Sequence, residues 1–251
     1  MVRFFTAQHD ISAHSIVLSA EDSDHIRSLR LRPDELFTVC DGEGNDYICR
    51  LGKLDADTTA EIVRREKSSG EPSIECRVFL AYSKGDRLDY AVQKSVELGA
   101  FEIVLFESGR CISVPRDIPK KTARLQRIAL ETAKQCGRGI IPVVSSGGKL
   151  DNVVAAAKHS ALPIFCYEAE DNLSLKEVLE RFFPASRKPN EDEIKSVSIF
   201  TGPEGGFEQA EVELARANSF HIVSLGSRIL RSESAPVVAL SAFMYHTGNL
   251  E

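Results

Sequence analysis

The most constraining feature of this sequence is an alternation of short apolar runs with longer amphipathic stretches, from residue 74 to residue 246. The run at residues 101–106 is almost entirely apolar, as in a strand with both faces covered. Such alternation predicts an α/β fold with a mostly parallel sheet between layers of helices. The predicted strands span residues 74–82, 101–106, 141–144, 162–167, 197–200 and 221–225, and the predicted helices span residues 87–98, 120–136, 150–159, 175–182, 208–218 and 237–246.

Two polar stretches that contain glycine follow predicted strands of this sheet. TGPEGGF, at residues 201–207, follows the strand at 197–200, and LGSRILRSESAP, at residues 225–236, follows the strand at 221–225. Open α/β sheets hold ligands outside the carboxyl ends of their strands, so we interpret the two stretches as two walls of one pocket. In the second stretch, Arg231 and Glu233 are the polar groups best placed to do chemistry.

The first of these stretches indicates the charge of the ligand. Its three glycines allow backbone groups to come close to whatever binds. The carboxylate of Glu204 would repel a polyphosphate and would favour a cation. The glycine spacing also differs from G-x-G-x-x-G and from G-x-x-x-x-G-K-[ST]. We therefore expect a nucleoside that carries positive charge rather than a nucleotide.

Residues 1–70 have another pattern, which predicts a small β domain. Alternation at residues 47–51 predicts a half-buried strand, and the turn-rich DGEGN before it predicts a hairpin. A short helix or turn at residues 24–32 carries three arginines, which are candidates for phosphate contact. SSGEP at residues 68–72 predicts a linker, and the polar stretch at 183–195 predicts a mobile loop.

Composition and charge narrow the function classes. No stretch approaches the roughly 20 apolar residues that span a bilayer, so we expect a soluble protein without a membrane partner. The six cysteines form no C-x-x-C pair, which predicts a reducing cytoplasm and no metal site. The net charge is -6, yet residues 110–138 hold eight basic residues and two acidic ones. This local excess predicts either a nucleic-acid contact or a solvated helix face.

The stretches GPEGGF and LGSRILRSESA resemble motifs of the SPOUT superfamily of knotted methyltransferases, and specifically the ribosomal RNA small subunit methyltransferase E family. Further blocks occur in the order of that family: LRLRP at 29–33, KGDRLD at 84–89, QKSVELG at 93–99 and ETAKQCGR at 131–138. The resemblance implies methyl transfer from S-adenosylmethionine to N3 of a uridine in small-subunit ribosomal RNA, in an assembled or assembling subunit. It also implies a PUA-like RNA-binding β-barrel at residues 1–70 and a trefoil-knotted SPOUT domain at residues 73–251.

The same resemblance implies a homodimer joined through the knotted region. The predicted helix at 237–246 is apolar on nearly every face, which indicates burial either in the core or in a subunit contact. A knot departs from the rule that chains are unknotted and is known here only through the resemblance.

Site residues follow from matching the motifs position by position. The expected cofactor-binding residues are Thr201, Gly202, Pro203, Glu204, Gly205, Gly206, Leu225, Gly226, Ile229, Leu230 and Ser232. The expected RNA-binding residues are Arg27, Arg30, Arg32, Arg124, Gln135 and Arg138.

Uridine N3 must lose its proton before it can attack, and the negative charge then spreads over two carbonyl oxygens. We expect Arg231 to supply a cation and Glu233 or Glu204 to accept the proton. The alternatives are a salt bridge between Arg231 and Glu233 that fixes the loop, and a helix-capping role for Glu204.

Two other function classes remain open. A nucleotide-dependent oxidoreductase should carry its glycine fingerprint near the first strand, whereas here the glycine stretch lies near the C-terminus. A noncatalytic ribosomal-RNA-binding protein with the same fold would bind RNA but not the methyl donor.

Overall fold

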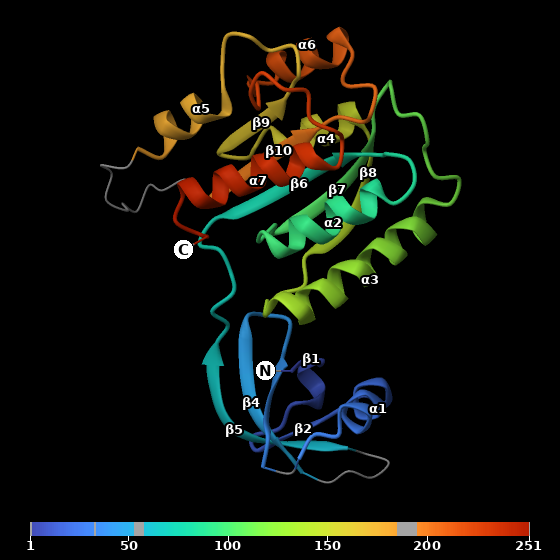
Figure 1. Ribbon diagram of the computed structural model, residues 1–251, viewed down its shortest axis with the longest axis vertical. Coiled ribbons are helices and arrows are strands. Elements are labelled where there is room, and N and C mark those ends of the chain that lie inside the picture. The colour runs from blue at the N-terminus through green and yellow to red at the C-terminus, as the bar shows by residue number, and fades with distance from the viewer. Residues whose placement is uncertain (1, 33, 53–57, 185–194, 251) are drawn as a thin grey trace. The chain divides into compact units, whose positions relative to one another are not determined.

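The chain forms two compact units in the computed structural model, which describes residues 2–32, 34–52, 58–184 and 195–250 (Figure 1). The first unit consists of Met1–Glu71 with Leu130–Ile141, and the second of Pro72–Ala129 with Pro142–Glu251. Most of the predicted loop at 183–195, and Pro33 of the LRLRP block, lie outside the described residues. In the described ranges, no helix is both long and apolar enough to cross a membrane.

The first unit is built on a five-stranded sheet in the order β1-β3-β4-β5-β2. Strand β1 runs parallel to β3, and the other neighbours pair antiparallel. The β3–β4 hairpin turns through two glycines with positive φ, Gly42 and Gly44, which confirms the predicted hairpin. The elements are β1 (Arg3–Phe5), η1 (Gln8–Asp10), β2 (Ser15–Val17), α1 (Ala20–Leu29), β3 (Leu36–Cys40), β4 (Asn45–Leu51) and β5 (Thr59–Lys67).

Two details of this unit differ from the sequence prediction. Ile48 is only 1% exposed and its neighbours Tyr47 and Cys49 are also buried, so β4 is covered on both faces and is not half-buried. Helix α1 starts before the predicted residue 24, because the hydroxyl of Ser19 accepts from the backbone N–H of Asp22 and caps the helix there.

A buried polar network fixes the stretch that the sequence suggested as a linker. The Arg138 side chain is 3% exposed, and its Nη2 lies 2.6 Å from Oε2 of Glu71. The other oxygen of Glu71 accepts from the backbone N–H groups of Gly139 and Ile140, at 2.9 and 3.0 Å. The hydroxyl of Ser68 donates to Asp46. The two units divide inside the predicted linker, between Glu71 and Pro72, and the side chains of Ser68 and Glu71 in this stretch are held by hydrogen bonds.

The second unit contains a six-stranded sheet in the order β11-β9-β10-β6-β7-β8, and every pairing in it is parallel. This arrangement confirms the predicted α/β class. Strand β8 begins two residues later than predicted and extends as far as Lys149. The strands are β6 (Glu75–Ala81), β7 (Glu102–Glu107), β8 (Val143–Lys149), β9 (Leu162–Cys166), β10 (Ser196–Thr201) and β11 (His221–Val223).

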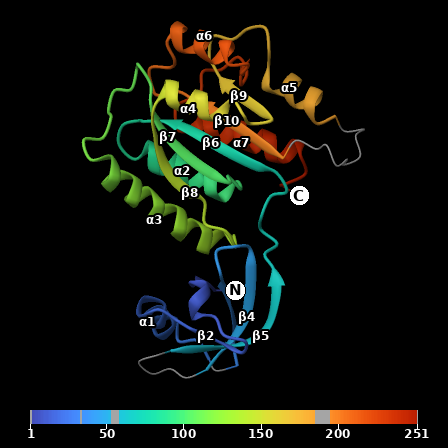
Figure 2. The same cartoon turned by 180° about the vertical axis from the view of Figure 1, so that it is seen from behind.

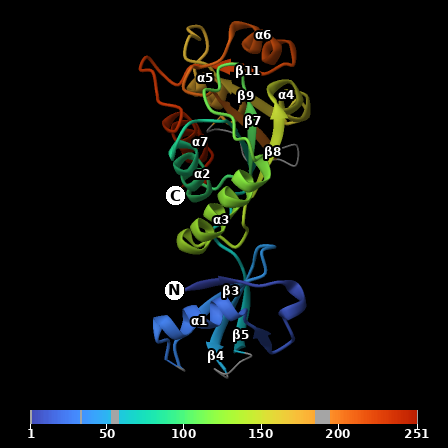
Figure 3. The ribbon, with the colours of Figure 1, turned by 90° about the vertical axis from the view of Figure 1, so that its right-hand side faces the viewer.

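Helices cover both faces of this sheet. Helices α2 and α7 lie on one face, and α4 and α6 lie on the other (Figures 2 and 3). Gly99 and Gly137 follow α2 and α3 with positive φ, as predicted from their positions at helix ends. The helices are α2 (Arg87–Glu97), α4 (Leu150–Ala157), α5 (Leu175–Phe182), α6 (Gln209–Ala217) and α7 (Ser234–His246), together with α3 (Ile118–Cys136), whose residues from Leu130 onward belong to the first unit.

Helix α7 is buried on one side only. Leu240, Phe243 and Met244 are fully buried, whereas Val238 is exposed and Tyr245 is 75% exposed. The prediction of an apolar helix packed in the core thus holds for one face, and the other face is apolar and open to solvent. The knot stays a prediction.

Phenylalanine side chains form the core beneath the carboxyl ends of the central strands. Phe200 of β10 stacks on Phe79 of β6, with their ring centroids 4.1 Å apart. Phe207 is fully buried, and its ring centroid lies 4.1 Å from that of Phe165. Because Phe207 ends the TGPEGGF stretch and β10 begins it, both ends of this stretch are anchored in the core.

Candidate functional site

A cavity of about 890 Å³ lies at the carboxyl ends of β9, β10 and β11. Three loops line it. We call them the acidic loop (residues 166–174, after β9), the glycine loop (residues 201–207, after β10) and the arginine loop (residues 224–235, after β11). The glycine and arginine loops are the two stretches that the sequence indicated as walls of one pocket, and the structure brings them together. Gly205 is the exception among the predicted residues: it does not line the cavity, and its carbonyl accepts from Arg110.

The glycine loop turns tightly at its end. The backbone N–H of Gly206 donates to the carbonyl of Pro203 at 3.0 Å, and Gly206 has a φ of 68°. A Cβ at Gly206 would collide with the carboxylate of Glu168 from the acidic loop. A Cβ at Gly202 would lie 3.1 Å from the ring of Phe207. Glycine at these two positions therefore lets the loop pack closely on its neighbours.

Glu204 connects the glycine loop to the segment after β6. Its Oε1 accepts from the backbone N–H of Lys84 and from Nη1 of Arg87, both at 2.8 Å. Burial alone would raise the pKa of the Glu204 carboxyl, but the backbone N–H groups of Lys84 and of Glu204 itself, together with Arg87, outweigh burial and hold the pKa below its ordinary value. Helix α6 is capped by Glu208 instead, so the capping interpretation of Glu204 is wrong.

The second oxygen of Glu204 is buried, and no hydrogen-bond partner for it lies in the described part of the chain. A buried carboxylate oxygen without a donor is costly, and a ligand donor or cation in the cavity would relieve that cost.

Arg87 lies between two carboxylates from different loops. Besides its bond to Glu204, its Nε lies 3.7 Å from Oε2 of Glu233 in the arginine loop. The hydroxyl of Ser232 donates to the same oxygen at 3.2 Å. Arg87 therefore joins the glycine loop to the arginine loop. Sequence reasoning missed this residue, although it belongs to the KGDRLD block, which directly follows a predicted strand.

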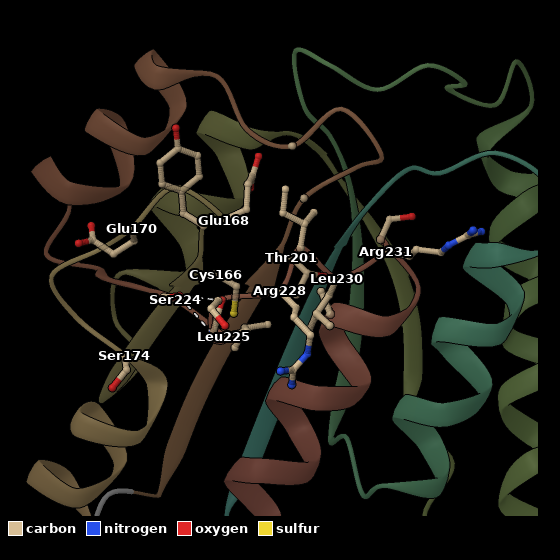
Figure 4. A pocket seen from close by; sticks show the side chains of 18 of the residues that line it. Cys166, Glu168, Glu170, Ser174, Thr201, Ser224, Leu225, Arg228, Leu230 and Arg231 are labelled. Atoms are coloured by element: carbon tan, nitrogen blue, oxygen red, sulfur yellow. Dashed lines mark hydrogen bonds between the residues drawn. The ribbon is translucent and has the colours of Figure 1, made fainter.

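The alternative interpretation, a salt bridge between Arg231 and Glu233, is absent from the ion pairs of the described residues, where Glu233 lies near Arg87 instead. Arg231 is exposed at the edge of the cavity (Figure 4). Gly226 in the same loop has a φ of 112°, and open space surrounds the position where a Cβ would be. Ile229 is also exposed. The arginine loop thus presents a cation, an apolar side chain and a stretch of accessible backbone.

The acidic loop is the third wall, and sequence reasoning missed it. Figure 4 shows Glu168 and Glu170 on one side of the cavity and Arg231 on the other. Glu170 is buried, and its Oε1 accepts from the backbone N–H of Asn172 at 2.8 Å. The signal was present in the sequence, because EAED at residues 168–171 directly follows the predicted strand at 162–167 and so had to lie at the same edge of the sheet.

The cavity has the size and charge of a site for a small cationic ligand. Its lining carries six carboxylates and three guanidinium groups, which leaves an excess of negative charge. Its volume falls within the range of about 300–1,000 Å³ that is typical of small-molecule sites. Among the described residues, no three histidine, cysteine or acidic side chains are grouped as metal ligands would be. These properties fit the positively charged nucleoside that the sequence indicated.

The residues expected to contact RNA are dispersed. Arg27, Arg30 and Arg32 are exposed at the end of α1 and just beyond it, where Arg27 pairs with Asp24 at 2.7 Å. Gln135 is exposed on α3. Nη1 of Arg124 lies 3.0 Å from the carboxylate of Asp89, whereas Arg138 is buried against Glu71. Five of the six expected RNA-binding residues are thus exposed, and Arg138 is buried.

Comparisons with known proteins cover both units. A sequence model of a family described as RNA methyltransferase domain matches residues 70–244, and one described as RNA methyltransferase PUA domain matches residues 18–60. The ribosomal RNA small subunit methyltransferase E of Synechocystis sp. is 30% identical over 95% of this chain and 76% of its own length. The protein of the same name from Mesomycoplasma hyopneumoniae is 28% identical over 96% of this chain and 98% of its own length.

A solved structure agrees with these sequence matches. The crystal structure of a ribosomal RNA small subunit methyltransferase E from Neisseria gonorrhoeae, bound to S-adenosyl methionine, superposes with a TM-score of 0.78. It is 28% identical and covers 98% of this chain and 97% of that chain. The fold of this chain is therefore similar to a solved methyltransferase fold along nearly its whole length.

Proposed function

The chain belongs to the ribosomal RNA small subunit methyltransferase E family, and on that premise we propose that it transfers a methyl group from S-adenosylmethionine to N3 of a uridine in small-subunit ribosomal RNA. One observation carries the proposal most directly: the cavity beside the glycine loop is large enough for a nucleoside and is lined by more carboxylates than guanidinium groups. A sulfonium ion is favoured by such a lining, and a polyphosphate is not.

The cavity offers separate groups for the two ends of the cofactor. Backbone groups of Leu225 and Gly226 and the side chains of Ile229 and Leu230 would hold the adenine and ribose. The glycine loop residues Thr201, Gly202, Pro203 and Gly206, with Ser232, would close the other side. Glu204 would face the sulfonium, and its unpartnered buried oxygen supports that assignment. S-adenosylmethionine supplies an electrophilic methyl group whose bond to sulfur breaks, leaving the electron pair on sulfur, as the new bond to nitrogen forms.

Glu233 is the better candidate for the group that takes the proton from uridine N3. Glu204 already accepts two hydrogen bonds, and its lowered pKa makes it a weak base. Glu233 accepts one bond from Ser232 at 3.2 Å, and its distance of 3.7 Å from Arg87 is longer than a hydrogen bond. In the proposed step the N3–H bond breaks, the proton passes to Glu233, and the electron pair on N3 becomes available to the methyl carbon.

Two guanidinium groups can meet the negative charge that develops on the uracil carbonyl oxygens. Arg231 is the one that the sequence indicated, and Arg87 is the one nearer to Glu233. The methylation rate of Arg231→Ala tells which of the two guanidinium groups stabilises this charge. If Arg231 does, the variant should be slower by about 100- to 1,000-fold, the usual effect of removing one charge-stabilising donor. A full methylation rate in this variant would transfer the role to Arg87.

The first unit would bind the RNA that surrounds the target. Its match to an RNA methyltransferase PUA domain and the exposed Arg27, Arg30 and Arg32 support this role. Gln135 and Arg138 of this unit and Arg124 of the second unit are the further candidates, of which Gln135 and Arg124 are exposed. Replacing the three arginines near α1 should reduce the slope of log affinity against log salt concentration by about 3, one unit for each phosphate contact. An unchanged slope would remove them from the interface.

We also propose a homodimer that forms through the exposed apolar face of α7. Val238 and Tyr245 are open to solvent on that face, and covering them in a dimer would remove their apolar surface from water. The site would then be completed across the contact. Sedimentation of the full chain and of Tyr245→Glu measures this directly, and a monomeric wild-type protein would exclude it. A ribosomal substrate and free cysteines are consistent with action in the cytoplasm.

Methyl transfer from labelled S-adenosylmethionine tests the central proposal. Small ribosomal subunits that lack native modification and naked RNA would be the two acceptors, followed by primer extension. N3 methylation blocks the Watson–Crick edge, so reverse transcriptase should stop one nucleotide before a single uridine. Label without a stop would mean that another atom is methylated. No label on either acceptor would refute the proposal and favour a noncatalytic RNA-binding protein.

A further inference from the structure

A second depression lies beside the cavity, in the second unit. We call it the side depression. It has a volume of about 720 Å³ and is lined by Lys84, Gly85, Asp86, Arg87, Tyr90, Glu233 and Ser234. Two of these residues, Arg87 and Glu233, also line the cavity. A ligand in the side depression would therefore meet the same two charged groups as the cofactor.

The charges around the side depression favour a neutral ligand. Lys84 and Arg87 are balanced by Asp86 and Glu233, so the lining carries no net charge. For a phosphate, attraction to Lys84 and Arg87 would be offset by repulsion from Asp86 and Glu233, so the lining gives an anion no net advantage. The lining instead combines hydrogen-bond donors with acceptors, which suits a planar group that carries both. A uracil base has this pattern, since its N3–H is a donor that lies between two carbonyl acceptors.

Tyr90 adds an aromatic ring on which such a base can stack. The Nζ of Lys94 lies over one face of this ring, 5.9 Å from its centroid, so the base would take the other face. Its side chain is 45% exposed, although the same helix buries Leu88, Ala91 and Val92 in the core. Its backbone N–H donates to the carbonyl of Asp86 at 3.0 Å, so the residue is held in the first turn of α2. Bases of single-stranded RNA are commonly bound by stacking on exposed aromatic side chains, because every base has a face that can stack.

We propose that the side depression receives the acceptor base, with the uracil ring against Tyr90, N3–H directed at Glu233 and a carbonyl oxygen directed at Arg87. This inference rests on the proposed function and adds to it the place of the acceptor and two residues, Tyr90 and Arg87, that sequence reasoning did not select. Glu233 lines both the side depression and the cavity, so it can take the N3 proton from beside the path along which the in-plane electron pair of N3 then attacks into the cavity. Arg87 is held at 2.8 Å by Glu204 while its Nε remains close to Glu233.

Photocrosslinking tests the placement without relying on methyl transfer. Small-subunit ribosomal RNA transcribed with 5-iodouridine would be bound to the full chain, irradiated and digested, and the crosslinked peptide would be identified by mass spectrometry. We expect a crosslink to the peptide that contains Tyr90. Crosslinks confined to peptides outside residues 84–90 and 233–234 would overturn the placement.

Steady-state kinetics give a second test, with small ribosomal subunits as the acceptor. Tyr90→Ala should raise KM for the subunit by roughly 5- to 150-fold, the range that stacking of one base supports. The dissociation constant for S-adenosylmethionine should stay within about twofold of wild type, and Tyr90→Phe, which keeps the ring, should restore KM. Phe101→Ala is the matched control, because Phe101 is an exposed aromatic residue that precedes β7 at the opposite edge of the sheet.

The two proposals fail in distinguishable ways. An active wild-type enzyme whose KM is unaffected by Tyr90→Ala would overturn the side depression as the acceptor site and leave the proposed function standing. A wild-type protein that methylates no RNA would refute the proposed function, whereas a crosslink at Tyr90 in that same protein would still support base binding in the side depression.

Discussion

Replacing Glu71 by alanine should destabilise the first unit far more than a surface substitution. The carboxylate of Glu71 pairs with Arg138 at 2.6 Å and accepts from two backbone N–H groups. The variant would leave the buried guanidinium and both N–H groups without this acceptor. Breaking a buried ion pair by removing one partner costs about 3–5 kcal/mol of the free energy of unfolding, and we expect Glu71→Ala to fall in that range.

Arg138→Ala should cost less, at about 1–3 kcal/mol, because Glu71 would keep its hydrogen bonds to Gly139 and Ile140. The double variant removes both charges, so its cost should be smaller than the sum of the two single costs by about 1–3 kcal/mol. This asymmetry follows from the donors that Glu71 keeps: two backbone N–H groups still donate to its carboxylate when Arg138 is replaced.

Hydrogen exchange followed by mass spectrometry would measure these costs, with peptides from β4 and β5 reporting the opening of the first unit alone. Glu66→Ala is the matched control, because the ion pair between Arg64 and Glu66 is exposed and should contribute less than about 1 kcal/mol. If the first unit opened no more easily in Glu71→Ala than in Glu66→Ala, Glu71 would not stabilise it as described. If the costs of Glu71→Ala and Arg138→Ala simply added in the double variant, the two side chains would not be coupled.

The second unit yields three more predictions. The folded pKa of Glu204 is lowered, so its contribution to stability is complete above the ordinary value of about 4.3 and is lost as the pH falls through the folded value. Glu204→Gln should therefore lower the urea concentration at the midpoint of unfolding relative to wild type at pH 7. At pH 4 the difference from wild type should be smaller. Phe207→Ala should cost about 3–5 kcal/mol in urea denaturation, because it empties a fully buried site. Gly206→Ala should cost about 1–2 kcal/mol and weaken calorimetric binding of S-adenosylmethionine, since its φ is 68° and the added Cβ would displace Glu168.

Each of these predictions has an outcome that would contradict it. A stability deficit of Glu204→Gln that stayed constant with pH would mean that its charge is unimportant. Phe207→Ala with an unchanged midpoint would mean that the aromatic core does not anchor the glycine loop. Gly206→Ala with wild-type affinity would exclude the close approach of the glycine and acidic loops.

The features that the sequence predicted correctly are those encoded by local pattern. Buried strands are short continuous apolar runs, whereas in helices apolar residues recur every three to four positions. The strands and helices of the parallel sheet could therefore be recognised one segment at a time. The glycine and arginine loops could be paired because the ends of parallel strands meet at one edge of a sheet. The same rule applies to the acidic loop, because it follows the predicted strand at 162–167 and so lies at the same edge of the sheet.

Contacts between distant segments were beyond local reasoning. Arg87 and Glu204 are 117 positions apart, and the sequence around one residue gives no indication that it contacts the other. Arg138 belongs to a basic run that resembles a solvated helix face, yet its partner Glu71 lies 67 positions away and buries it. Ile48 shows the same limit, because a period of two identifies the two faces of a strand but not what covers each face.

The sharing of Arg87 and Glu233 by the cavity and the side depression has a thermodynamic consequence. A ligand that reorients either side chain in one site changes the free energy of binding in the other. If the occupied cavity raises the affinity of the side depression by some factor, the occupied side depression raises the affinity of the cavity by the same factor. The two substrates of this protein would then bind cooperatively, with a coupling energy set mainly by two side chains.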